Sequence, residues 1–171
     1  MHTAFSRPIV HRNLKASSVF LDQNYVAKLS DFSITVSIPE GESHVKDRVE
    51  GTIGLIAPES LRTGCFNEKN DVYGFGVLLP VMLTGQRAFD SSRPEKGEEF
   101  LLVDHVKKNI QKNRFREMVD PSITAKEPWP RKEQQLEAFA GLAFKCTYHS
   151  AEDRPTMIEV AKELRYMYQI S

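Results

Sequence analysis

The sequence predicts a mainly α-helical domain with a small β corner. Residues 72–83 are almost continuously apolar, two later segments repeat apolar residues at helical spacing, and short β-leaning runs come early in the chain. A length of 171 residues suits one domain with a single core.

The first third of the chain predicts short strands and loops. Residues 19–22 and 26–29 favour β structure, and Asp22-Gln23-Asn24 between them favours the turn of a hairpin. Residues 33–56 carry proline and glycine among scattered polar residues, at Pro39, Gly41, Gly51 and Gly54. We therefore expect a long irregular loop there, which in a compact domain is usually functional or disordered.

The next part of the chain predicts helices. Residues 72–83 predict a helix that is buried on all sides. Pro80 lies inside it, removes one backbone hydrogen bond and clashes with the carbonyl of Gly76. We expect a kink that costs about 3 kcal/mol unless neighbouring groups accommodate it. Residues 98–112 predict a charged amphipathic helix whose apolar contacts are Phe100, Leu101, Val103 and Val106.

Two later helices follow the i, i+3, i+4, i+7 spacing of a surface helix. The first carries Leu136, Phe139, Ala140 and Ala143, and the second carries Met157, Val160, Ala161 and Leu164. Pro155 is expected near the first turn of the second helix, where proline is tolerated. Met157, Met167 and the phenylalanines at helical spacing are expected to be core side chains rather than a ligand site.

Composition and charge exclude several classes of function. Lys plus Arg is 23 and Asp plus Glu is 23, so there is no electrostatic reason to expect a nucleic acid or an anionic membrane as the main partner. No apolar run approaches the roughly 20 residues that cross a bilayer, and the N-terminus lacks the apolar core of a secretory signal. We expect a soluble intracellular chain with no direct membrane insertion, in which Cys65 and Cys146 are reduced thiols.

Five short segments carry the functional information. In order, they are His11-Arg12-Asn13-Leu14-Lys15, Asp31-Phe32-Ser33, Ala57-Pro58-Glu59, Asp71-Val72-Tyr73-Gly74-Phe75-Gly76 and Glu152-Asp153-Arg154-Pro155-Thr156-Met157. This order and spacing resembles the C-terminal lobe of a eukaryotic protein kinase, with its catalytic loop, metal-binding loop, end of the activation segment and buried helix.

The resemblance implies a kinase-like C-lobe over residues 1–171, with the N-lobe absent. The end of an entering helix, the catalytic loop and the hairpin would occupy residues 1–30, the activation segment residues 31–59, and a helical subdomain residues 60–171.

Departures from the kinase pattern bear on catalysis. Asn13 stands where kinases place the Asp that accepts the substrate hydroxyl proton, and a neutral amide cannot accept a proton at neutral pH. Proton-transfer catalysis is typically worth about 10²–10⁴-fold. Ser18 stands where the family uses an Asn to hold a second Mg²⁺, and its short hydroxyl is a poor metal ligand. Asp31 is retained and could bind one Mg²⁺ or could be a loop residue bound by neighbouring amides, while Ser33 replaces a glycine.

The elements that hold ATP in the family are not found in the ten residues before His11. There is no Gly-rich loop, strand lysine or partner glutamate, and phosphoryl transfer depends on positioning the phosphates. Met1-His2-Thr3-Ala4-Phe5 resembles the tail of the helix that enters the catalytic loop, so the chain is expected to start within that helix. We expect no phosphoryl transfer and no cofactor in this chain, although the family uses ATP and Mg²⁺. Lys15, which contacts the transferred phosphate in the family, is expected to be vestigial and solvated.

Other motif residues are expected to be structural. The resemblance implies that His11 and Arg12 are structural and that Asp71 accepts hydrogen bonds from the backbone of the catalytic loop. It also implies that Glu59 and Arg154 form a buried ion pair, and removing one partner of such a pair costs about 3–5 kcal/mol.

Arg12 is the position that receives an activation-loop phosphate in many kinases. The candidate modified groups are Ser37, Ser43 and Thr52, of which Thr52 is expected to hydrogen-bond locally instead. We expect the acidic pair Glu40 and Glu42 to neutralise Arg12 without modification.

A finer resemblance concerns plant proteins. Plant receptor-like and receptor-like cytoplasmic kinases resemble this chain at Gly51-Thr52-Ile53-Gly54, Val119-Asp120-Pro121 and Lys145-Cys146-Thr147. The ZED/ZRK-type (HopZ-ETI-deficient-like) pseudokinases, which resemble wall-associated kinases, are similar at Asn13, Asp31-Phe32-Ser33 and residues 37–42. Members of that group act as adaptors for a coiled-coil NLR immune receptor. The resemblance therefore implies protein partners, such as an NLR receptor and related receptor-like kinases, and a cytoplasmic location with any plasma-membrane attachment supplied by a partner.

Three functions stay open on the sequence. The first is a catalytically impaired adaptor or decoy in plant immune or receptor signalling, which binds proteins through its activation segment and helical face. The second is an ATP-dependent serine/threonine receptor-like kinase of the wall-associated type, seen only in part, and the third is a fragment without function. Asn13 and Ser18 favour the first, because together they remove the base and the second metal ligand.

Overall fold

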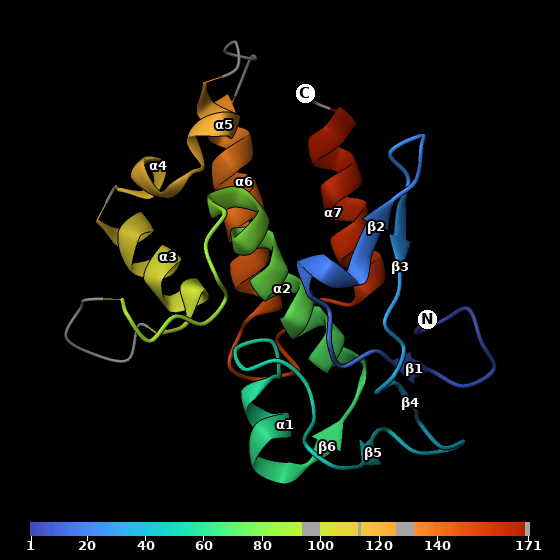
Figure 1. Cartoon of the computed structure of the whole chain (residues 1–171). Helices are drawn as coiled ribbons and strands as arrows, with labels where there is room; N and C mark the ends of the chain where they lie inside the picture. The colour runs from blue at the N-terminus through green and yellow to red at the C-terminus, as the bar shows by residue number, and fades with distance from the viewer. Residues whose placement is uncertain (94–99, 113, 126–131, 170–171) are drawn as a thin grey trace.

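A computed structural model of the chain is mainly helical, with short strand pairs near the N-terminal end (Figure 1). It describes every residue except 94–99, 113, 126–131 and 170–171. Helix α2 lies at the centre, with α6 and α7 packed against it and α3 to α5 on one side (Figure 1). Helix α1 lies at one end with β5 and β6, and the β2–β3 hairpin lies on the side of α7 (Figure 1). The predicted fold class, mainly α with a small β corner, agrees with this arrangement.

Within the described residues, the strands form three separate antiparallel pairs. They are β1 (Ile9–Val10) with β4 (Val36–Ser37), β2 (Val19–Leu21) with β3 (Ala27–Leu29), and β5 (Val45–Lys46) with β6 (Cys65–Phe66). A 3-10 turn, η1 (Ala16–Ser18), leads directly into β2. The predicted hairpin is confirmed: Val19 pairs with Leu29, and the Asp22 carboxylate accepts the amide protons of Asn24 and Val26 in the turn.

The segment 33–56 is irregular over most of its length, as predicted, but the prediction missed two strands inside it. β4 and β5 each contain only two residues, too few to produce an alternating pattern in the sequence. Their partners β1 and β6 lie elsewhere in the chain, so this segment is tied to the domain at two points.

The expected end of an entering helix in Met1–Phe5 is wrong for this structure, in which these residues form turns. The segment is held instead by a side chain, since His2 Nε2 lies 2.9 Å from Asp71 Oδ2.

Helix α2 (Glu68–Thr84) is longer than the sequence predicted. It begins at the N-cap Asn67, whose side chain accepts the amide proton of Lys69, and ends at Gly85 in the left-handed conformation. It continues through Pro80, whose carbonyl accepts the Thr84 hydroxyl proton at 2.8 Å. Burial on all sides is wrong at Met82, which is 52% exposed because it borders an open groove.

The predicted 98–112 helix is shorter in the structure, as α3 (Leu102–Gln111). Leu101 is its extended N-cap and bridges to Phe89, which holds Leu101 and the half-exposed Phe100 outside the helix. Residues 98 and 99 lie outside the described residues. Two short helices follow, α4 (Phe115–Met118) and α5 (Pro121–Thr124).

The two later helices are confirmed as α6 (Lys132–Cys146) and α7 (Met157–Gln169). In α6, Ala140 and Ala143 are buried as the stripe predicts. In α7, Val160 is buried but Ala161 is exposed, so the predicted stripe is wrong at that residue. Pro155 lies just before α7, near its first turn as predicted, and Thr156 and Glu159 form a reciprocal capping box there.

The part of the chain that the structure describes has three core clusters around α2. One joins α2 to α3, α4 and α6, another joins α2 to α6 and α7, and a third joins α2 and α3 to residues 55–57. Met157 and Met167 are partly buried and pack against the second cluster, and each also lines a cavity. Helix α1 (Pro58–Thr63) follows the third cluster directly.

The two cysteines are free thiols, as predicted. Within the described residues, no helix is both long enough and apolar enough to span a bilayer.

Candidate functional site

The loop after β1 is fixed by the first turn of α2. Asp71 is buried there, and its two carboxylate oxygens accept the backbone amide protons of His11 and Arg12, each at 2.8 Å. The His11 side chain extends the anchoring, because its Nε2 lies 2.9 Å from the carbonyl oxygen of Ser30. The kinase resemblance implied the hydrogen bonds from the loop backbone to Asp71 but not the contact between His11 and Ser30. The buried Asp71 carboxylate therefore fixes the loop that carries Asn13 and Lys15.

Asn13 is buried and hydrogen-bonded across the site. Its Oδ1 accepts the hydroxyl proton of Thr52 at 2.8 Å, which links the loop to the end of the activation segment. Its backbone amide donates to His11 Nδ1 at 3.3 Å. The carboxamide oxygen of Asn13 accepts this hydrogen bond from Thr52, but a carboxamide has no basic site that could take up a proton. Thr52 was expected to hydrogen-bond locally, and its partner is instead Asn13, 39 residues away in the sequence.

Ser18 is fully buried, and its hydroxyl is directed at the backbone of the same loop. Its hydroxyl donates to the carbonyl of Asn13 at 3.0 Å, and its own carbonyl accepts the amide proton of Ser30 at 2.8 Å. The hydroxyl therefore stabilises the loop, and it stands where the family places a metal ligand.

Asp31 retains a carboxylate at the surface of the site. Its backbone is left-handed, with φ of 63°, and its Oδ1 accepts the Ser33 hydroxyl proton at 2.9 Å. Lys15 Nζ lies 3.5 Å from Oδ2, so Lys15 is paired rather than simply solvated as predicted. The hydrogen bond from Ser33 lowers the pKa of Asp31 from its ordinary value, and the nearby Lys15 lowers it further.

These residues do not fit the two-metal ATP site of the family. Asp31 could supply one oxygen ligand, but the Ser18 hydroxyl is engaged with Asn13 and Lys15 already pairs with Asp31. Among the described residues, no group of three or more His, Cys, Asp or Glu side chains is placed to hold a metal ion.

Arg12 has a different acidic partner from the one predicted. Neither Glu40 nor Glu42 forms an ion pair with it, and the guanidinium lies 3.0 Å from Asp47 Oδ2 instead. The pairing of β5 with β6 places Asp47 beside Arg12, whereas Glu40 and Glu42 lie in an exposed turn before β5. Of the candidate modified groups, Ser37 and Ser43 are exposed and Thr52 is half-buried.

Glu59 and Arg154 form the expected ion pair between the end of the activation segment and the helical base. Two guanidinium nitrogens donate to the two carboxylate oxygens at 2.6 and 2.8 Å. The pair joins residues far apart in the chain, but it is buried on one side only, because the Arg154 side chain is fully buried whereas the Glu59 side chain is 28% exposed.

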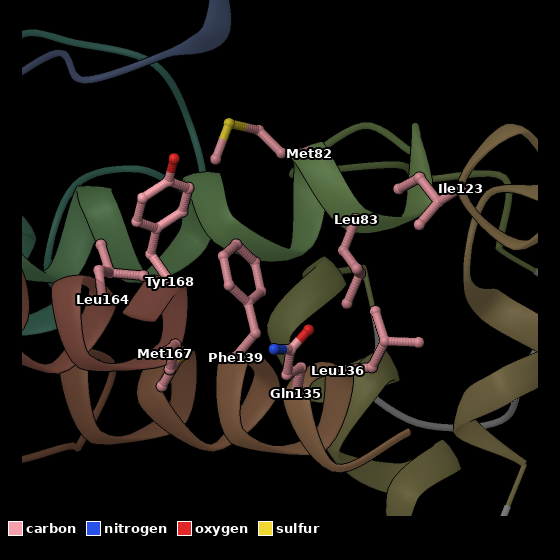
Figure 2. A pocket seen from close by; sticks show the side chains of 9 residues that line it. All are labelled: Met82, Leu83, Ile123, Gln135, Leu136, Phe139, Leu164, Met167 and Tyr168. Carbon is pink, nitrogen blue, oxygen red and sulfur yellow. The ribbon is translucent and has the colours of Figure 1, made fainter. Parts of the chain in front are cut away.

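Two cavities lie beside α7, and neither is lined by Asn13, Ser18 or Asp31. One, of about 410 Å³, lies between the N-terminal turn and the first turns of α2 and α7. The other is an open apolar groove of about 330 Å³ between α2, α5, α6 and α7, where Met82, Phe139 and Tyr168 surround the space (Figure 2).

Sequence reasoning missed two residues that shape this site, His2 and Asp47. His2 shares the Asp71 carboxylate with the loop amides, and Asp47 neutralises Arg12. Nothing in their spacing indicated these roles. The sequence indicates that Arg12 needs an acidic partner, but several acidic residues in the same segment could supply it, so the sequence does not single out Asp47.

The comparison with known proteins agrees with this geometry. Residues 1–167 match the protein kinase domain family, and the chain belongs to that family.

Its relatives include receptor kinases and a pseudokinase of Arabidopsis thaliana. A probable LRR receptor-like serine/threonine-protein kinase is 41% identical over 165 residues, covering 96% of this chain and 26% of the relative. The non-functional pseudokinase ZED1 is 40% identical over 176 residues, covering 100% of this chain and 52% of the relative. Wall-associated receptor kinase 4 is 35% identical over 164 residues, covering 96% of this chain and 21% of the relative. The chain thus spans from about a fifth to about half of the length of these relatives.

Proposed function

We propose that this chain is a catalytically impaired kinase-like domain that acts as a protein-binding adaptor or decoy in plant immune or receptor signalling. The observation that carries the proposal is the state of Asn13, an amide at the base position whose oxygen is occupied by Thr52. The inward hydroxyl of Ser18 supports it, because the second metal ligand is lost at the same site. The similarity to a relative named as a non-functional pseudokinase points the same way.

The proposed partners are proteins, namely a coiled-coil NLR immune receptor and related receptor-like kinases. The activation segment and helix α1 offer apolar side chains for such contacts, since Val49, Ile53 and Leu61 are all exposed. The proposed location is the cytoplasm, with any attachment to the plasma membrane made through a partner.

The loss of catalysis is tested by grafting. Residues 1–171 replace the matching segment of an active receptor-like kinase, and transfer of radiolabelled γ-phosphate to a protein substrate is measured. We expect a loss of about 10²-fold or more against the parent kinase, because the proton acceptor is missing. A second graft with Asn13→Asp and Ser18→Asn serves as the matched control and should regain activity. Transfer by the unmodified graft at the parent rate would contradict the proposal and favour the serine/threonine kinase, to which the retained Asp31 and the receptor-kinase relatives point.

Thermal melting of the chain itself separates the adaptor from a fragment without function. We expect a cooperative transition that ATP and Mg²⁺ do not shift, since a ligand raises the melting temperature only if the folded state binds it. A non-cooperative transition would favour the fragment.

Binding is tested by co-purification with a coiled-coil NLR receptor. Ile53→Asp should weaken capture, whereas Phe20→Asp, on the β2–β3 hairpin, should not, although the two side chains are similarly exposed at 68% and 61%. Equal effects of the two substitutions would argue against the activation segment as the contact surface.

A further inference from the structure

We propose that the groove between α2 and α7 is a docking site for an amphipathic helix of a partner protein, a helix that carries an apolar stripe with acidic residues along one side of it. No residue of the activation segment, 31–59, lines either cavity beside α7. The inference therefore goes beyond the contact surface proposed above and does not depend on it.

The two cavities open on one face of α7. Met157 and Ala161 line the cavity next to the N-terminal turn, and Leu164 and Tyr168 line the apolar groove. These four residues are spaced i, i+4, i+7 and i+11, which places them in one row along an α-helix. At a rise of about 1.5 Å per residue, the row is about 16 Å long, or about three turns. The two cavities are therefore the two ends of one groove.

Helix α2 supplies the opposite wall. Val72 lines the first cavity, and Met82 and Leu83 line the second (Figure 2). The distance along α2 from Val72 to Met82 is about 15 Å, which is close to the length of the row on α7. Two apolar walls of this length suit about three turns of a helix whose apolar face lies in the groove.

The groove leaves exposed what the sequence pattern predicts to be buried. The apolar run of α2 predicts burial at Met82, and the stripe of α7 predicts burial at Ala161, yet Met82 is 52% exposed and Ala161 is exposed as well. Ile158 and Tyr168, which line the two ends, are 50% and 83% exposed. Contiguous apolar side chains that are exposed in this way mark an interaction surface.

Two side chains of the groove suit a helical partner in particular. Ala161 lies between the two ends, and its small side chain lets another helix approach α7 closely. Met82 is unbranched and flexible, so it can adjust to the side chains that enter beside it.

The rim of the groove along α7 is basic. Ile158 lines the first cavity, and Lys162 and Arg165 follow it at i+4 and i+7, so both exposed cations lie along the same edge. The acidic side chain of Glu68 also lines the first cavity, but it belongs to the first turn of α2, on the opposite wall.

The acidic side chains of α7 itself are engaged with other groups. Glu159 accepts the amide proton of Thr156 at 2.7 Å, and Glu163 accepts a proton from Lys145 Nζ at 2.8 Å. The rim therefore presents two positive charges to a partner, and these charges favour a helix that is acidic on the side next to α7.

The test measures binding of two labelled synthetic peptides to the 171-residue chain by fluorescence anisotropy. Both peptides form helices of about four turns with leucines at i, i+4, i+7 and i+11. One carries glutamates beside the leucine row, and the other carries lysines at the same positions. We expect the glutamate peptide to bind at least about tenfold more tightly than the lysine peptide. Absent binding of the glutamate peptide, or equal affinities of the two, would overturn the proposal.

A substitution locates the binding in the groove. Ala161→Gln puts a bulky polar side chain between the two ends and should weaken binding of the glutamate peptide by about tenfold. Ala138→Gln is the matched control, because Ala138 is an exposed alanine of α6 that lines neither cavity, and it should change the affinity by less than about twofold. Equal effects of the two substitutions would place the binding elsewhere and contradict the proposal.

A charge exchange keeps the test decisive if Ala161→Gln disturbs the packing of α7. The double variant Lys162→Glu, Arg165→Glu changes only exposed side chains and should reverse the preference, so that the lysine peptide binds more tightly. An unchanged preference would show that the rim does not select the partner. Sedimentation of the chain tests a second copy as the occupant, and a dimer that Ala161→Gln dissociates would overturn the assignment to a partner protein.

Discussion

Arg154 is the largest of the fully buried side chains in the described structure. Its guanidinium is surrounded by oxygen atoms, because it donates to both oxygens of Glu59 and to the carbonyl of Tyr148 at 2.8 Å. It also lies 5.0 Å from the centroid of the Tyr73 ring. A buried cation with this many partners contributes to stability mainly through the penalty that follows when one partner is removed.

The first prediction concerns this ion pair. Glu59→Gln should lower the free energy of unfolding by about 3 kcal/mol, because it leaves the buried guanidinium without a counter-charge. Denaturant titration measures the change. Glu133→Gln is the control: it breaks an ion pair with Arg116 in which both side chains are exposed, and it should cost less than about 1 kcal/mol. Similar losses in the two variants would mean that burial does not determine how much the Glu59–Arg154 ion pair contributes to the free energy of unfolding.

At the scale of elements, helices α2 and α6 are in tight contact at Gly76. A Cβ atom there would lie 2.5 Å from the Cβ of Cys146 and 3.0 Å from the carbonyl oxygen of Ala143. Neither atom can move away by a change of rotamer. The glycine therefore permits the two central helices to pack closely enough to share the core of Val72, Leu79 and Leu142.

The second prediction uses this contact. Gly76→Ala should destabilise the protein by about 2 kcal/mol, since the cost of overpacking exceeds the helix propensity gained from alanine. The matched control is Gly141→Ala in α6, where an added Cβ meets nothing within 4 Å, and where alanine should stabilise by up to about 1 kcal/mol. Thermal and denaturant unfolding of both variants measures the two changes. Effects of the same sign would contradict the packing explanation.

At the scale of the whole molecule, two buried acids favour the folded state only while they are protonated. Burial raises the pKa of the Cys146 thiol to about 12 and the pKa of the Tyr73 hydroxyl to about 12. Their ordinary values are 9.0 and 10.0. The stability that these groups contribute is therefore complete below pH 9.0 and is lost as the pH rises from 9.0 toward about 12.

The third prediction follows from the raised pKa values of Cys146 and Tyr73. The free energy of unfolding should fall with rising pH above pH 9.0, as measured by denaturant titration across the alkaline range.

In the folded protein near neutral pH, an alkylating reagent should label the partly exposed Cys65 and spare Cys146, which should react only on unfolding. Labelling of both thiols at equal rates in the folded state would contradict the burial of Cys146.

Much of the fold could be predicted because its signals are local. The stripes of α6 and α7 and the turn of the β2–β3 hairpin lie within a few residues of each other in the chain. The start of α3 could not be predicted in the same way, since Leu101 leaves the helical pattern through a bridge to Phe89. The strands β4 and β5 were missed for a related reason, because each exists only through a distant partner.

The sequence alone determined which chemical groups stand at positions 13 and 18 of the site. An amide at Asn13 and a hydroxyl at Ser18 lack a proton acceptor and a strong metal ligand in any arrangement of the chain. Only the tertiary structure decided which acid neutralises Arg12. Glu40, Glu42 and Asp47 carry the same charge in the same loop, and the pairing of β5 with β6 brings Asp47 to the guanidinium. The physical reason is that the type of a side chain sets what it can do, whereas its partner depends on the path of the backbone through space.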